Sequence, residues 1–162
     1  MDYRPNIDAM TWFVRDVMPR LRSRSNPPCL WIVGANPAKA VRALAGDNVC
    51  VTGRVPDVRP YLRHANAVVA PLRIGRGIQN KVLEAMAMGA PSVVTPQARE
   101  GLDKCQADEL LTADDPADFA NAVAQILDGK FPNMGARGQK RVAKDYRWSD
   151  SLAVLDQILA SA

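Results

Sequence analysis

The chain has 162 residues, 48% of them hydrophobic and 23% charged, which is typical of a folded globular domain. Lysine and arginine number 21 against 17 aspartates and glutamates, so the net charge is +4. No apolar run approaches the length of about 20 residues that a membrane-spanning helix needs, and the first residues lack the apolar core of a signal peptide. We therefore expect a cytoplasmic protein. Peripheral attachment to the inner membrane face stays open for the full-length protein.

The cysteines and arginines indicate which bonds and ligands to expect in this protein. Cys29, Cys50 and Cys105 are odd in number and widely spaced, so neither a disulfide framework nor a metal site is expected. Arginines outnumber lysines by 15 to 6, and since a guanidinium binds phosphate through two parallel hydrogen bonds, a phosphorylated ligand is indicated. Nucleic acid is not expected as a partner, because basic residues cluster only at 20–24 and aromatic residues are just 6%.

Apolar strand-like runs alternate with helix-like segments along the chain. The predicted elements are helix 7–24, strand 29–34, helix 37–44, strand 48–53, helix 57–65, strand 67–72, helix 79–88, strand 92–95, strand 109–112, helix 116–127, helix 135–146 and a last helix capped by Ser149. Continuous apolar strands that alternate with helices predict an α/β protein with a Rossmann-like parallel sheet covered by helices on both faces.

In such open sheets, ligands bind beyond the carboxyl ends of the strands. The loops at these ends follow Gly34, Gly53, Pro71 and Thr95. A glycine at the first two positions lets a ligand approach the backbone closely, although a plain turn explains each glycine equally well.

The loop 71–79 leads directly into the helix 79–88. The first backbone N–H groups of a helix have no partners within the helix, and together with the helix dipole they favour an anion. Arg73, Arg76 and Lys81 add positive charge at the same place, so a phosphate or diphosphate could be held there without a metal. The spacing matches neither the dinucleotide-binding fingerprint nor a P-loop.

Glu84 is the only charged residue between Lys81 and Arg99. Its helical position places it on the same face as Asn80 and Lys81. One interpretation is a carboxylate that accepts hydrogen bonds from the hydroxyls of a ribose or sugar. The other is an ion pair with Lys81, one helical turn earlier.

Several stretches resemble the donor-binding half of retaining GT-B glycosyltransferases of family 4, also called group 1. They are NKVLEAMAMGAPSVV at 80–94, VTGRVPD at 51–57 and YLRHANAVVAPL at 61–72, with further similarity at 1–19 and 146–149. The resemblance keeps the order of the family and covers nearly the whole chain. The bacterial sugar transferases of exopolysaccharide systems look most similar.

The resemblance implies roles for particular residues. The family has a pair of acids with seven residues between them, of which the second binds the ribose, and this position falls on Glu84. The first acid, which contacts the donor sugar, falls on Arg76, which could bind phosphate instead. Arg4 is the nearest candidate for a phosphate-binding arginine of the family, and Pro5 stands where a lysine is usual. The expected donor-binding residues are Arg4, Gly34, Arg54, Val55, Gly77, Ile78, Gln79, Asn80 and Glu84, with Arg76 and Lys81 as catalytic residues.

Within this set the backbone at Gly77, Ile78 and Gln79 is expected to face the diphosphate and sugar, and Arg54 and Val55 to line the base. The resemblance also implies that residues 1–162 form a single nucleotide-sugar-binding domain. On this resemblance, the first strand of the family's donor half and its N-terminal acceptor domain are expected to be missing.

The expected activity of the full-length protein is retaining, hexosyltransferase-like transfer from a UDP- or GDP-sugar to a glycan or lipid-linked acceptor. The acceptor would bind through the missing domain, so the fragment alone is expected to be inactive. No cofactor and no obligatory metal are expected. Two alternatives stay open, namely half of a sugar-nucleotide epimerase and a non-catalytic nucleotide-binding module. A Ser-His-Asp triad is disfavoured, because the only histidine, His64, falls on a predicted helix.

Overall fold

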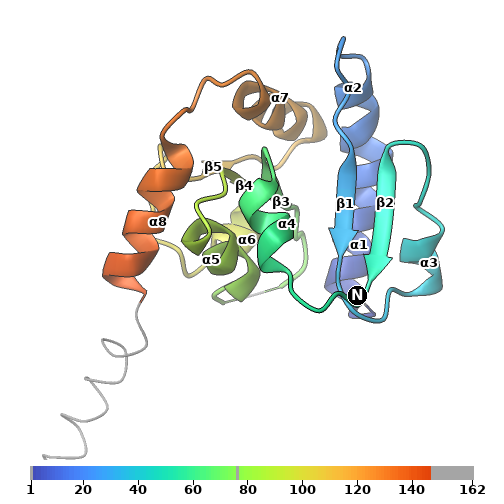
Figure 1. The fold of residues 1–162 in the computed structure, drawn as a ribbon, viewed down its shortest axis with the longest axis horizontal. Helices are drawn as coiled ribbons and strands as arrows, with labels where there is room; N and C mark the ends of the chain where they lie inside the picture. The colour runs from blue at the N-terminus through green and yellow to red at the C-terminus, as the bar shows by residue number, and fades with distance from the viewer. Residues whose placement is uncertain (1, 76, 147–162) are drawn as a thin grey trace, which may run out of the picture.

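The computed structural model describes residues 2–75 and 77–146, and their arrangement is shown in Figure 1. Two parallel sheets are present in this part of the chain. One pairs β1 (Leu30–Val33) with β2 (Val49–Gly53), and the other has the order β3 (Val68–Ala70), β4 (Ser92–Val94), β5 (Leu111–Thr112). Each strand lies where the hydrophobic pattern predicts one, so the parallel α/β class is confirmed.

The N-terminal helix is longer and less regular than predicted. It runs through α1 (Arg4–Trp12), a π-helical segment η1 (Phe13–Val17) and α2 (Met18–Arg22). It begins three residues before the predicted start, because Pro5 is tolerated in a first turn, where its missing N–H has no partner to lose. The widened π turn precedes Pro19, whose ring would clash with the carbonyl group four residues back in a regular α-helix.

The other helices cover or connect the strands. They are α3 (Lys39–Arg42), α4 (Arg59–His64), α5 (Asn80–Ala87), α6 (Pro96–Arg99), α7 (Pro116–Leu127) and α8 (Met134–Asp145). The single turn α6 was not predicted, because it is too short to show a helical period. The Thr95 side chain accepts a hydrogen bond from the backbone N–H of Ala98 at 3.3 Å and caps it. The predicted helix after Ser149 lies outside the described residues.

One core joins the two sheets. Trp12 and Phe13 each meet Phe119 of α7 edge to face, with ring centroids 5.6 and 5.8 Å apart. Ile32 of β1 and Val93 of β4 pack in the same cluster. The N-terminal helical segment and α7 therefore hold both sheets. A second core packs Val82 and Met86 of α5 against β4 and the loop that follows it.

The sheet is divided, which the sequence pattern did not predict. Within the described residues no strand joins β1 to β3, and α4 lies along the connection between the sheets. Trp31, on the face of β1 opposite Ile32, is 54% exposed and contacts Tyr61 of α4, with ring centroids 5.9 Å apart. Since α4 itself has no buried residue, helices do not fully cover both faces of β1 and β2.

Candidate functional site

The loop between β3 and α5 leaves the core immediately after the strand. Pro71 and Leu72 are buried, whereas the chain from Arg73 to Gly75 is exposed. Gly77 has a φ of 77°, in the left-handed region that favours glycine, and allows the chain to turn into α5. The loop therefore presents its backbone at the carboxyl end of β3, as the sequence predicts for a ligand-binding edge.

Arg73, at the start of this loop, is held by α1. Its Nε and Nη2 donate to the two carboxylate oxygens of Asp8 at 3.1 and 2.7 Å. Its guanidinium also lies 5.6 Å from the centre of the Trp12 ring, a cation–π distance. The hydrogen bonds that Arg73 donates to Asp8 raise the pKa of Arg73. The sequence suggested Arg73 as a phosphate-binding charge, but in the structure its charge is already paired with Asp8.

Lys81, in the first turn of α5, also reaches α1. Its Nζ donates to Asn6 Oδ1 at 2.8 Å. Although the residue as a whole is exposed, protein atoms crowd the amine end of the side chain, and this desolvation lowers the pKa of Lys81 against the opposing effect of the Glu84 carboxylate. An ammonium group has three donors, so Asn6 leaves two of them for a ligand.

Glu84 is exposed and does not form the ion pair with Lys81 that the sequence left open. In the described part of the chain, no cation lies within salt-bridge distance of its carboxylate, because Lys81 turns toward Asn6 instead. Asn80, Lys81 and Glu84 share the exposed side of α5, opposite the buried Val82 and Ala85. A free carboxylate and an ammonium thus lie one helical turn apart near the start of this helix.

The N-terminus of α5 has open donors. Gln79 is the capping residue, yet its side chain caps nothing and donates instead to the carbonyl oxygen of Gly77 at 3.1 Å. Among residues 2–75 and 77–146, no group accepts a hydrogen bond from the N–H of Asn80 or Lys81. These N–H groups and the two remaining donors of Lys81 can together receive an anion.

A second loop supports Ile78 from the other side. A Cβ placed on Gly101 would lie 2.8 Å from Ile78 Cγ1 and 3.1 Å from the Ile78 backbone nitrogen, and Gly101 has a φ of 82°. Only glycine allows this approach without displacement. Near this contact, a shallow hollow is lined by residues that follow β4 and by the last residue of β5: Pro96, Gln97, Arg99, Glu100, Asp103 and Thr112. The hollow extends the exposed surface at the carboxyl ends of the strands.

The remaining predicted residues lie on the other sheet or outside the described chain. Gly34 follows β1 and donates its N–H to the Gly53 carbonyl oxygen at 3.3 Å, while the exposed Arg54 and half-buried Val55 follow β2. In Figure 1 both strands point toward the end of the fold where α1 begins with the exposed Arg4. No hydrogen bond or ion pair of the described residues links this group to the start of α5.

Arg76, the first predicted catalytic residue, is outside the described residues, so its role stays a prediction. The role of Lys81 and the donor contacts of the other residues are likewise predictions. Asn6, Asp8, Trp12 and Gly101 were not expected at the site. The sequence showed a helix over 7–24, but nothing in a helical pattern indicates which polar residue meets a loop 65 residues later.

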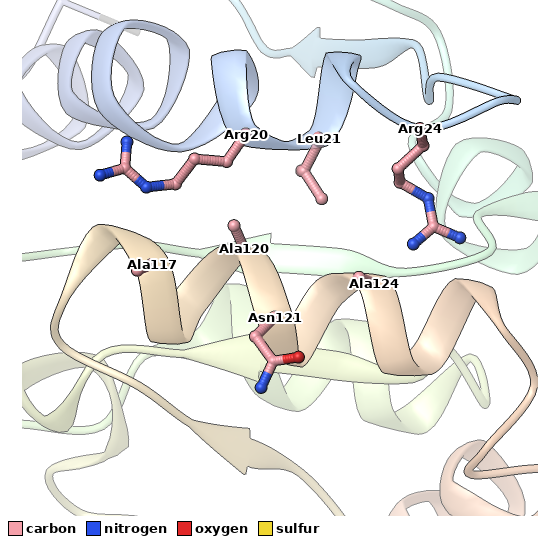
Figure 2. Close-up of a pocket in the computed structure, with 7 residues that line it drawn as sticks. All are labelled: Arg20, Leu21, Arg24, Ala117, Ala120, Asn121 and Ala124. Carbon is pink, nitrogen blue, oxygen red and sulfur yellow. The ribbon is translucent and has the colours of Figure 1, made fainter.

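A groove between α2 and α7 does not belong to this site. Figure 2 shows its lining, which consists of Arg20, Leu21, Arg24, Ala117, Ala120, Asn121 and Ala124. It follows the seam between the two helices that hold the core, and small alanines on α7 leave the space. No cluster of catalytic side chains lines it, so it is a packing groove.

Neither a metal-binding cluster nor a transmembrane helix is found in the part of the chain that the structure describes. There, no three histidine, cysteine, aspartate or glutamate side chains come together in a way that could hold a metal ion. None of the described helices is both long and apolar enough to cross a membrane.

Parallel strands with a ligand-accessible loop at their carboxyl ends define a Rossmann-like α/β protein. The family model described as glycosyl transferases group 1 matches residues 1–129, which include both sheets and the whole of α5, and the chain belongs to this family. No curated protein matches the chain. Membership confirms the family resemblance and supports transfer of a sugar from a nucleotide sugar. The narrower likeness to exopolysaccharide enzymes has no support from it.

Proposed function

We propose that this chain is the nucleotide-sugar-binding domain of a retaining glycosyltransferase. Family membership supports sugar transfer from a nucleotide sugar. The donor would be a UDP- or GDP-sugar, and the acceptor a glycan or lipid-linked sugar that binds to another part of the complete enzyme, at the cytoplasmic side of the inner membrane. The observation that carries the proposal is the Glu84 carboxylate, which has no salt-bridge partner among the described residues and lies one turn from Lys81 near the start of α5.

Each group at α5 has a role in this proposal. Glu84 accepts hydrogen bonds from the ribose hydroxyls. The open N–H groups of Asn80 and Lys81 and the Lys81 ammonium hold the diphosphate. As the sugar–oxygen bond breaks, negative charge develops on the departing diphosphate, and donors already in place stabilise that charge without reorganising.

The other predicted residues complete the donor site. The backbone of Gly77, Ile78 and Gln79 faces the diphosphate and sugar, and the loop at Arg54 and Val55 lines the base. Gly34 allows close approach after β1. Arg4 and Arg76 add charge near the phosphates, with Arg76 in place of the sugar-binding acid that is usual in the family. No metal is required, so we expect nucleotide binding to be unchanged by EDTA.

Calorimetric titration of the chain with UDP and GDP tests the proposal. We expect one of them to bind, and Glu84→Gln to weaken binding about tenfold, because hydrogen bonds to a charged acceptor are lost. Asp47→Asn is the control: Asp47 is an exposed acid near the amino end of β2, away from α5. Absence of binding by both nucleotides would overturn the proposal, and equal losses in the two variants would remove the ribose role of Glu84.

The type of reaction is tested with the full-length protein. Incubated with a nucleotide sugar and no acceptor, a transferase leaves the donor sugar unchanged apart from slow hydrolysis, whereas an epimerase converts it. Conversion of the sugar without acceptor would therefore replace transfer by epimerisation while leaving the donor site in place.

A further inference from the structure

The loop that carries the proposed diphosphate site is held at both ends by one helix. At its start, Arg73 forms two hydrogen bonds to Asp8, and just after it, Lys81 donates to Asn6. Asn6 and Asp8 both belong to α1, whose inner side is fixed in the core through Ala9 and Trp12. The residues between these two contacts include Gly75 and Gly77, which on their own would leave the loop free to move.

The guanidinium group of Arg73 has contacts on two sides. Asp8 takes Nε and Nη2, which are the donors of one edge of the guanidinium, and the Trp12 ring lies 5.6 Å from its central carbon. A planar guanidinium binds phosphate best through two parallel hydrogen bonds, and Asp8 already uses such an arrangement. Arg73 is thereby suited to holding the loop rather than to binding the ligand.

We propose that Asp8 is a positioning residue of the donor site. Through Arg73 it fixes residues 73–75 and 77–79 of the loop against Trp12, and this places the open N–H groups at the start of α5 where they receive the diphosphate. Arg73 does not contact the donor. The role in ligand binding rests on the proposed function, whereas the anchoring of the loop does not.

The direction in which Asp8→Asn changes nucleotide affinity separates a positioning role of Asp8 from a phosphate-binding role of Arg73. If Arg73 were a phosphate ligand, Asp8→Asn would free its positive charge and strengthen binding of UDP or GDP. If Asp8 positions the loop, Asp8→Asn weakens binding of that nucleotide diphosphate by about fivefold. Affinity for the corresponding nucleoside, which has no phosphate, then stays within about twofold, since the base and ribose contacts lie elsewhere.

Hydrogen exchange tests the anchoring without any ligand. In Asp8→Asn we expect faster exchange of the backbone amides of residues 73–75 and 77–79 and unchanged exchange in β4 and α7. The control is Asp108→Asn, which breaks another exposed ion pair, between Arg137 and Asp108, away from the loop. It should change neither the exchange of the loop nor nucleotide affinity.

The double variant Asp8→Asn/Arg73→Gln completes the test. Because both residues act through one contact, it should bind no more weakly than either single variant. Should Asp8→Asn fail to fold, Arg73→Lys is measured in the same way, since it keeps the charge and loses the paired hydrogen bonds. Unchanged loop exchange, or tighter nucleotide binding, overturns the positioning role. Absence of nucleotide binding by the unmodified chain overturns the proposed function instead, and the exchange result still decides the anchoring.

Discussion

At the scale of single residues, Lys81 and Glu84 show how a helix can keep opposite charges apart. Their spacing favours an ion pair, yet Lys81 donates to Asn6. The pair would have contributed little at an exposed site, so its absence costs little. Its absence leaves both charges available to a ligand, which a surface ion pair would not.

Gly101 gives a prediction at the same scale. Gly101→Ala should lower the free energy of unfolding by about 1–3 kcal/mol, because the new methyl group meets Ile78 and the positive φ is strained. If the proposed donor site is right, Gly101→Ala should also weaken binding of UDP or GDP, since Ile78 lies in the loop proposed to face the diphosphate. Urea denaturation and calorimetry measure the two effects.

Gly129→Ala is the matched control, because Gly129 has a similar φ of 72° but no atom within 4 Å of the added Cβ. Gly129→Ala should lower the free energy of unfolding through backbone strain alone and leave nucleotide affinity unchanged. Equal losses of stability in the two variants would mean that the contact with Ile78 does not contribute to the destabilisation by Gly101→Ala.

At the scale of elements, α8 crosses the C-terminal end of α5 at very close range. A Cβ on Gly135 would lie 1.9 Å from the carbonyl oxygen of Gly89, and the Gln139 side chain donates to the Ala87 carbonyl oxygen at 2.8 Å. Gly138 lies over Met86 in the same contact. The small residues of α8 therefore determine how closely the two helices approach, and they support α5 from the side opposite the ligand loop.

Because of this contact, replacing Gly135 by alanine should change protein stability in the direction opposite to that expected from helix propensity. Glycine to alanine within a helix normally stabilises by up to about 1 kcal/mol. Gly135→Ala should instead destabilise by about 2–3 kcal/mol, because its methyl group meets backbone rather than a flexible side chain. Gly138→Ala should cost less, since its added Cβ would lie 3.2 Å from both the Glu109 carbonyl oxygen and the Met86 side chain, a much milder approach than that at Gly135. Thermal denaturation of both variants measures the difference, and a stabilised Gly135→Ala would contradict the close contact.

At the scale of the whole molecule, a charged network connects α8 to the loop before β5. Arg141 donates from Nε to both carboxylate oxygens of Glu109, at 3.1 and 3.0 Å, and from Nη1 to Asp145 at 2.7 Å. Burial alone would raise the pKa of Glu109, but the hydrogen bonds from Arg141 and from the N–H of Gln106 outweigh it and lower the pKa. Hydrogen bonds from Arg141 also lower the pKa of Asp145.

The network predicts how stability depends on pH. Since both carboxyl pKa values are lower in the folded state than in the unfolded one, their contribution is present above the unfolded values and is lost as pH falls through the folded ones. Arg141→Met should lower the free energy of unfolding near neutral pH by about 3 kcal/mol, because it leaves the buried Glu109, 8% exposed, without its counter-ion and with only the hydrogen bond from the Gln106 N–H.

Urea denaturation between pH 7 and pH 3 measures this effect. The unmodified chain should lose stability toward the acid end, and the Arg141→Met variant should lose less over the same range. Parallel curves for the two proteins would exclude the network as a source of the acid sensitivity.

The strands and most helices could be predicted because the sequence of each segment contains its own signal, either an apolar run or a helical period of apolar residues. Glu84 and Lys81 could also be singled out, since they stand near the start of a helix after a glycine-containing loop. The partners of these residues could not be predicted. Asp8 and Arg73 meet across 65 residues of sequence, and the division between β1 and β3 depends on which strands become neighbours, which hydrophobicity does not encode.

Trp12 has an edge-to-face contact with Phe119 in the core and a cation–π contact with Arg73 at the surface. A single side chain thus belongs both to the packing that keeps the fold together and to the support of the ligand loop. The consequence is evolutionary: the core around α7 and the loop before α5 cannot diverge independently. A substitution at Phe119 that disturbs its contact with Trp12 would therefore also disturb Arg73 and the loop that it anchors.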